Sequence, residues 1–155
     1  MSLTPRIVLH ADRAIAALEA AQPAAQLLAR LYVAKVFFLS GLTKLRDWDT
    51  TLALFSDEYH VPLLPPELAA WLGTAGELVL PALLALGLIG RVSAAGLFFV
   101  NAVAVISLAE IADAALQQHV FWGSLLLALM LWGPGRWSVD AWWVGSRARR
   151  LQLSR

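Results

Sequence analysis

The sequence predicts an all-α membrane protein, in which an N-terminal amphipathic helix precedes a four-transmembrane-helix bundle. Of its 155 residues, 59% are hydrophobic and only 15% are charged, whereas a soluble domain usually has about 25% charged residues. Four apolar stretches approach the ~20 residues that a helix needs to cross a bilayer. They are Ala24–Leu42, Leu68–Ile89, Val92–Ala112 and His119–Gly133. Most of the seven tryptophans fall near the ends of these stretches, where aromatic belts form. The alternative is a soluble bundle of unusually apolar helices.

The chain divides into three predicted parts, which follow from where the apolar stretches begin and end. Residues 1–23 are predicted as an interfacial segment on the membrane surface, and Pro23 is expected to separate it from the first span. The apolar side of this segment consists of Ile7, Ala11, Ile15 and Leu18. Residues 24–143 are predicted as the transmembrane domain and residues 144–155 as a basic cytoplasmic tail. The alternative for the first part is a partly ordered tail with some helical bias.

One acidic residue, Glu77, lies near the middle of the second apolar stretch. Because an acid at the bilayer centre costs about 2.5–3.5 kcal/mol, Glu77 is expected to face the interior of the bundle. A helical rotation of about 100° per residue places Gly73 on the same side and Gly76 at its margin, where small residues let another helix approach. Pro81 leaves a backbone carbonyl near Glu77 without its usual hydrogen bond. We therefore expect an interior helix with a polar centre.

The first apolar stretch contains two basic residues and is followed by a third. Five residues on one face form a packing seam with a base at each end. The seam consists of Arg30, Ala34, Phe37, Gly41 and Lys44. Arg30 and Glu77 are expected to differ in depth by about 7 or 8 Å, which predicts an ion pair between them; protonation of Glu77 is the competing way to neutralise it. Lys35 points elsewhere, along a groove or toward a neighbouring subunit of a homo-oligomer.

Two further polar residues complete the set of candidates. Asn101 lies at mid-depth in the third stretch, and His119 opens the fourth. Together, five residues are predicted to bind a ligand or handle protons in a cavity that opens to the outer side of the membrane. They are Glu77, His119, Arg30, Lys44 and Asn101. The alternative is that these residues only hold the helices together. Arg91 is assigned a structural role, in the tight turn between the second and third stretches.

The longest loop, residues 43–67, is rich in acidic residues. Asp47 or Asp49 is expected to start a short helix on the membrane surface. Three residues of the loop carry side chains that bind metals in other proteins. They are Asp57, Glu58 and His60. Their spacing is not a recognised ligand pattern, so the prediction is a solvated acidic loop without a metal site.

The sequence contains no cysteine, which excludes disulfides, thiolate metal sites and dithiol chemistry. No haem site is expected either, because Met130 lies about three turns from His119. Any redox role would therefore depend on a bound quinone or on a cofactor that a partner protein carries.

The distribution of basic residues predicts the orientation in the membrane. Four spans put both termini and the turn at Arg91 on one side, together with most of the arginines. The loops on the other side carry only Lys44 and Arg46 as basic residues. The positive-inside rule then places both termini in the cytoplasm. This topology and anionic lipid explain the basic tail, so no nucleic-acid partner is expected.

Several short motifs resemble those of the DoxX family of small bacterial and archaeal membrane proteins. They are Arg30 with GLTKL at residues 41–45, YHVP at 59–62, GEL at 76–78, LALGLIGR at 84–91, His119, and GPGRWSVD at 133–140. The resemblance covers about residues 27–140. It implies a four-helix bundle in the bacterial inner membrane and an association with membrane redox systems, although a shared fold does not fix the function.

The resemblance and the polar residues together suggest an accessory subunit of a quinone-linked redox or oxidative-stress system. A quinone or a similar small amphipathic molecule would bind between the helices, and a redox protein would be the partner. Glu77 and His119 would exchange protons with the head group, while Arg30, Lys44 and Asn101 would orient it.

Two other functions stay open at this point. One is a non-enzymatic binding or escort protein that recruits a partner through residues 43–67. The other is transport, which needs an oligomer because four helices are few for a pore. The sequence leaves open whether the protein catalyses a reaction.

Overall fold

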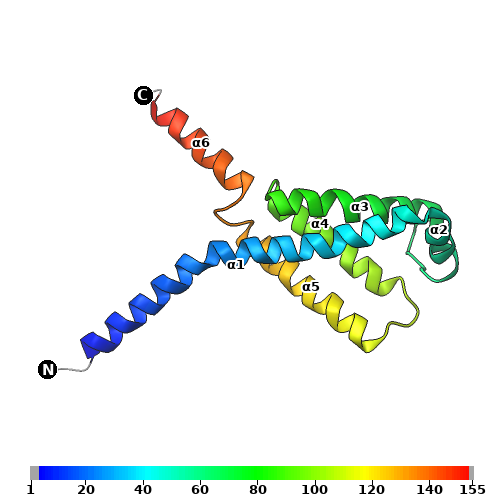
Figure 1. Ribbon diagram of the computed structural model, residues 1–155, viewed down its shortest axis with the longest axis horizontal. Helices are drawn as coiled ribbons and strands as arrows, with labels where there is room; N and C mark the ends of the chain where they lie inside the picture. The colour runs from blue at the N-terminus through cyan, green and yellow to red at the C-terminus, as the bar shows by residue number, and fades with distance from the viewer. Residues whose placement is uncertain (1–3, 154–155) are drawn as a thin grey trace.

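Six helices form the part of the chain that the structure describes, residues 4–153, and this part contains no β-sheet (Figure 1). The structure is a computed structural model. In chain order the helices are α1 (Thr4–Arg46), α2 (Trp48–Asp57), α3 (Pro66–Leu86), α4 (Gly90–Ile106), α5 (Asp113–Trp132) and α6 (Val139–Leu153). A single antiparallel bridge joins Tyr59 to Leu108. The predicted all-α class is confirmed.

Four of the helices, α1, α3, α4 and α5, pack into a bundle (Figure 1). α3 packs against α1 and α4, α4 also packs against α5, and the contact between α1 and α5 is less extensive. The buried apolar core consists of Val33, Phe37, Leu84, Ala94, Leu97, Leu126 and Leu129. We call the end of the bundle that carries α2 the α2 end, and the opposite end, where α6 begins, the α6 end.

The outer surface of the bundle is apolar. α1, α3 and α5 are each long and apolar enough to cross a membrane, and α4 is a shorter apolar helix. Only 17% of the residues in the most apolar part of α5 are buried, and side chains such as Leu131 and Phe99 are exposed. Because lipid is the solvent that such a surface requires, the helices are suited to a bilayer.

α1 is one continuous helix, and the predicted break at Pro23 is wrong. Proline removes only one backbone hydrogen bond, the one to the carbonyl of Glu19. This carbonyl lies on a part of the helix where every side chain from residue 8 to residue 22 is exposed, so water can replace the lost bond. Pro23 is buried and marks where α1 enters the bundle; the segment before it projects outward (Figure 1).

The predicted turn between the second and third apolar stretches is present. Gly87 ends α3 with a φ of +66°, a conformation that favours glycine. Ile89 follows with a φ of +44°, which is strained for a β-branched residue. The carboxylate of Asp140 accepts hydrogen bonds from the N–H groups of Ile89 and Gly90, at 2.9 and 2.8 Å. Asp140 thus holds the strained turn and caps the start of α4 from a distant part of the chain.

The third and fourth apolar stretches have different boundaries from those predicted. α4 ends at Ile106 and not at Ala112, and α5 begins more than one turn before His119. Directly after α4 ends, the outer loop contacts the chain, where the backbone N–H of His60 donates to the carbonyl of Ser107 at 2.7 Å. A contact between residues so distant in sequence leaves no trace in apolar periodicity. Because α5 begins at Asp113, His119 lies inside a helix.

Candidate functional site

α2 and the loop after it cover the α2 end of the bundle. Asp47 is the N-cap of α2 and accepts hydrogen bonds from the hydroxyl and the N–H of Thr50, at 2.7 and 3.0 Å. These bonds hold the pKa of Asp47 below its ordinary value. Of the two predicted helix starts, Asp47 and Asp49, the structure has the one at Asp47. Phe55 of α2 is buried with Ala70 of α3, and Tyr59 packs against this small core.

Glu77 faces the interior, as predicted, but its partner is Lys44. Lys44 Nζ lies 2.5 Å from Glu77 Oε2 and also donates to Ser40 Oγ at 3.0 Å. The Lys44 and Glu77 side chains are 20% and 10% exposed, so the ion pair is largely withdrawn from solvent. The expected ion pair between Arg30 and Glu77 is therefore wrong.

The register between α1 and α3 explains this result. The two helices pack closely at Gly41, where a Cβ would lie 3.1 Å from Glu77 Cβ. Gly41 is about one turn from Lys44 but about three turns, or roughly 16 Å, from Arg30. The depth estimate from sequence assumed that the first two spans end at one level. In the structure Gly41 lies beside Glu77, and from this level α3 continues about three turns to Pro66 at the α2 end, whereas α1 continues only about one and a half turns to Arg46.

Arg30 belongs to a separate polar cluster at the α6 end. It is 1% exposed, and its Nη2 donates to the carbonyl of Trp137 at 2.6 Å. The guanidinium lies against Gly87, where a Cβ would overlap Nη1, and it is attracted by the carboxylate of Asp140. Its Nε and Nη1 have no hydrogen-bond partner among the described residues. The cluster ties α1 to the turn after α3 and to the segment before α6.

Asn101 and His119 form a reciprocal pair between α4 and α5. Asn101 Nδ2 donates to the backbone carbonyl of His119 at 3.0 Å, and Asn101 Oδ1 lies 2.9 Å from His119 Nδ1. Gly123 leaves room for this pair, because a Cβ there would lie 3.2 Å from Asn101 Nδ2. The imidazole meets the ring of Trp122 edge-on, with centroids 5.1 Å apart. The pair therefore fixes the orientation of His119.

A cavity of about 670 Å³ at the α2 end brings the ion pair and His119 together. Most of its lining is apolar. The side chains that can exchange hydrogen bonds with a ligand include Ser40, Lys44, Tyr59, Glu77 and His119. Three of the five predicted site residues, Lys44, Glu77 and His119, thus line the same cavity.

The two other predicted site residues do not line this cavity. Asn101 acts on it only through His119, and Arg30 lies at the α6 end. Ser40 and Tyr59 line it without having been predicted. Ser40 gave no signal in the sequence, because a serine one turn before a lysine is common on any helix.

Tyr59 did give a signal, as part of the YHVP element, but its place depends on how α2 packs. Its ring meets Phe55 edge-on, with centroids 5.1 Å apart. Burial first, and then the negative charges of Glu58 and Glu77, raise the pKa of the Tyr59 phenol. The phenol therefore keeps its proton at neutral pH and can donate a hydrogen bond.

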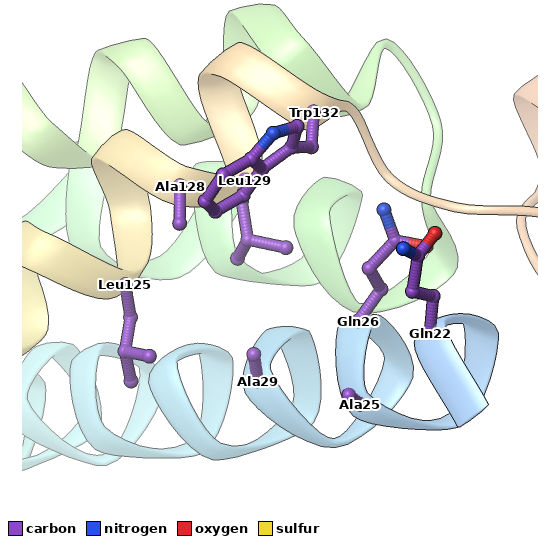
Figure 2. A pocket seen from close by; sticks show the side chains of 8 residues that line it. All are labelled: Gln22, Ala25, Gln26, Ala29, Leu125, Ala128, Leu129 and Trp132. Carbon is purple, nitrogen blue, oxygen red and sulfur yellow. The ribbon is translucent and has the colours of Figure 1, made fainter. Parts of the chain in front are cut away.

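A second cavity, of about 540 Å³, lies between α1 and α5 near the α6 end (Figure 2). Small side chains such as Ala25 and Ala128 leave the space between the helices, and the amides of Gln22 and Gln26 lie at one end of it (Figure 2). None of its lining residues is charged or a histidine. We therefore place the candidate site at the first cavity, which has groups that can transfer protons.

The described part of the chain contains no group of three or more histidine, aspartate and glutamate residues that could hold a metal ion. In the outer loop, His60 Nδ1 lies 3.2 Å from the carbonyl of Glu58.

The residues predicted to serve packing lie at helix contacts. Gly76 approaches a valine of α4, and Gly73 approaches a phenylalanine of α2, with 3.2 and 3.5 Å to the position of an added Cβ. Pro81 is buried in α3 without ending it. Arg91 lies beside Gly133, the residue that follows α5.

The comparison with protein families gives one match. The family model described as DoxX matches residues 25–110, which is more than half of the chain. This range holds Lys44, Tyr59, Glu77 and Asn101, whereas His119 lies beyond it. No curated protein and no solved structure matches the chain.

Proposed function

This chain belongs to the DoxX family and is a multi-pass membrane protein, and from this premise we propose that it binds a quinone or a similar small amphipathic molecule in the α2-end cavity. The same proposal makes it an accessory subunit of a quinone-linked redox or oxidative-stress system. One observation carries the proposal: the Lys44–Glu77 pair and His119 line a single, mostly apolar cavity.

The size and lining of the cavity suit such a ligand. Ligand pockets usually measure about 300–1,000 Å³ and combine apolar walls with a few polar groups. Two lining residues, Phe99 and Ile106, are also 69% and 64% exposed on the outer surface of the bundle. The cavity therefore reaches the surface that would face lipid, so a hydrocarbon tail could extend into the bilayer while the head group meets Glu77 and His119.

The polar side chains suit proton transfer. A quinol gives up two protons with its two electrons, so bases within hydrogen-bond reach assist the reaction. Glu77 and His119 would accept the protons, and Lys44 would orient the head group. The electrons would pass to a cofactor of a partner redox protein. Arg30 has no role here, because it lies at the opposite end of the bundle.

We propose that α4 is the fourth span. Its 17 residues give a length of about 26 Å, close to the ~30 Å hydrocarbon core of a bilayer. Four crossings would put both termini on one side. The positive-inside rule would make this side the cytoplasm of a bacterial inner membrane, so the α2 end and its cavity would face outward.

A second candidate function is the recruitment of a protein partner through residues 43–67. Leu63 in this loop is fully exposed and has a φ of +66°. Backbone strain of this kind clusters at binding sites, so the conformation of Leu63 favours a binding surface on this loop. Leu63 also lines the cavity, so a partner on this loop would control access to a ligand.

Mass spectrometry of small molecules extracted from the gently purified protein tests the proposed function. We expect a stoichiometric quinone in the wild-type protein and its loss in Glu77→Gln, which removes the carboxylate at the cavity. The matched control is Glu67→Gln, because Glu67 is an exposed acid of the same helix and is not part of the lining.

Bulk phospholipid alone in all three samples would contradict quinone binding and favour the partner-recruiting function. A pull-down that depends on Leu63 and yields a specific membrane or soluble protein would then support that alternative. A quinone that stays bound in Glu77→Gln would leave ligand binding intact but contradict the role given to Glu77.

A further inference from the structure

The Asn101–His119 pair determines which nitrogen of His119 carries a proton. The backbone carbonyl of His119 can only accept a hydrogen bond, so the Asn101 atom 3.0 Å away must be the amide nitrogen. The amide oxygen, 2.9 Å from His119 Nδ1, can likewise only accept. Nδ1 is therefore the N–H of the neutral ring, and Nε2 carries a lone pair.

Nε2 is the nitrogen that is left for a ligand. His119 lines the cavity, and its Nε2 has no hydrogen-bond partner among the described residues. A half-turn of the ring would exchange Nδ1 for a carbon, so the hydrogen bond to Asn101 opposes it. The edge-on contact with Trp122 restrains the ring further. The neutral imidazole thus presents a fixed hydrogen-bond acceptor.

The other polar groups at the cavity offer, as a set, both donors and acceptors. Lys44 offers N–H donors, and Glu77 offers carboxylate oxygens, within one ion pair. Tyr59 and Ser40 carry hydroxyls, which donate and accept. A ligand oxygen of either kind can find a partner among these side chains. Selection between a hydroxyl and a carbonyl therefore falls to His119.

From this geometry we infer that the cavity binds the hydroxylated, reduced form of its ring ligand in preference to the oxidised form, an inference that rests on the proposed function. A quinol hydroxyl donates to Nε2, whereas a quinone carbonyl brings a lone pair against another lone pair. Sites built to pair with a hydroxyl discriminate strongly against analogues that lack it. We expect the quinol to bind at least about tenfold more tightly, which corresponds to ~1.4 kcal/mol.

Calorimetric titration of the purified full-length protein tests the inference. The probes are decylubiquinol, decylubiquinone and the dimethyl ether of the quinol, measured without oxygen in lipid nanodiscs. The pH is 8, above the ordinary imidazole pKa of about 6.5. We expect tight binding of the quinol, and weaker binding of both the quinone and the ether, because neither of these can donate a hydrogen bond.

Variants assign the preference to the pair. His119→Gln, whose amide can turn to donate or accept, and Asn101→Leu, which frees the ring, should both bind the quinol and the quinone with similar affinities. The matched control is His10→Gln, since His10 is exposed on the projecting segment of α1 and should leave the preference unchanged. The result for Asn101→Leu counts only if a thermal melt shows that this variant is folded. If it is not folded, His119→Gln alone provides the test.

The outcomes separate the two proposals. Equal binding of quinol and quinone by the wild-type protein would overturn the inference and leave the proposed function intact. A preference that persists in His119→Gln would overturn the assignment to His119. Binding of none of the three probes would overturn the inference and the proposed function together.

Discussion

The Lys44–Glu77 ion pair predicts a strong coupling between two substitutions. Breaking a buried ion pair from one side costs about 3–5 kcal/mol, because a charge is left without its partner. The side chains of Lys44 and Glu77 are 20% and 10% exposed and line a cavity. This partial access favours the lower end of the range. We therefore expect Lys44→Met and Glu77→Gln each to lower the free energy of unfolding by about 3 kcal/mol.

The double variant leaves no unpaired charge. Replacing both members of a buried pair is often close to neutral, so we expect the double variant to lose no more than about 3 kcal/mol, and the coupling energy to reach about 3 kcal/mol. Chemical unfolding in detergent micelles, followed by tryptophan fluorescence, measures all four proteins. Lys35→Met is the control, because Lys35 is exposed on α1 and should show no loss. Additive losses of about 6 kcal/mol would refute the reasoning.

Three further predictions concern packing, capping and pH. Gly41→Leu should lower the unfolding free energy by about 1–3 kcal/mol, because a Cβ at Gly41 would already lie 2.9 Å from Leu78 Cγ. The control is Gly145→Leu, at a site with open space. Equal losses of stability in the two variants would contradict the close packing at Gly41. Asp140→Ala should lower the free energy of unfolding by about 2 kcal/mol in the same assay, because two N–H groups at the start of α4 lose their acceptor. A change below ~0.5 kcal/mol would show that the carboxylate does not hold the turn. The pKa of Tyr59 is raised in the folded protein, so the stability that its neutral phenol contributes is present below the ordinary value of about 10 and falls as the pH rises through the folded value. Tyr59→Phe should reduce this alkaline loss in thermal melts, and an identical pH dependence in both proteins would contradict it.

Patterns within one helix predicted much of the fold. The seam on α1 is buried at Arg30, Ala34, Phe37 and Gly41 and leaves Lys35 exposed, because a face that repeats every three or four residues follows from helix geometry alone. The start of α2 at Asp47 follows in the same way from local capping chemistry. The inward direction of Glu77 follows from the cost of facing lipid.

Relations between helices could not be derived from the sequence. The error over Arg30 and Glu77 is an error of register between α1 and α3, which depends on where Gly41 meets Glu77. The end of α4 lies beside the contact between His60 and Ser107, and the cap on α4 comes from Asp140, about fifty residues away. Each of these contacts joins segments far apart in the chain, so no local pattern records it.

The polar residues of the bundle divide into two groups with opposite characters. At the α6 end, Arg30 and Asp140 bind the chain itself, through the carbonyl of Trp137 and the N–H groups of the turn after α3. Arg30 is 1% exposed, and its Nε and Nη1 have no hydrogen-bond partner among the described residues. At the α2 end, by contrast, the polar side chains line a cavity, and His119 keeps one nitrogen unengaged. The hydrogen bonds within the chain at the α6 end serve stability, whereas the polar side chains that line the cavity at the α2 end can contact a ligand. The composition of a set of polar residues in a membrane bundle therefore does not assign them one role. Helix register decides which of these residues meet, and only the residues that meet at a cavity can act on a ligand there.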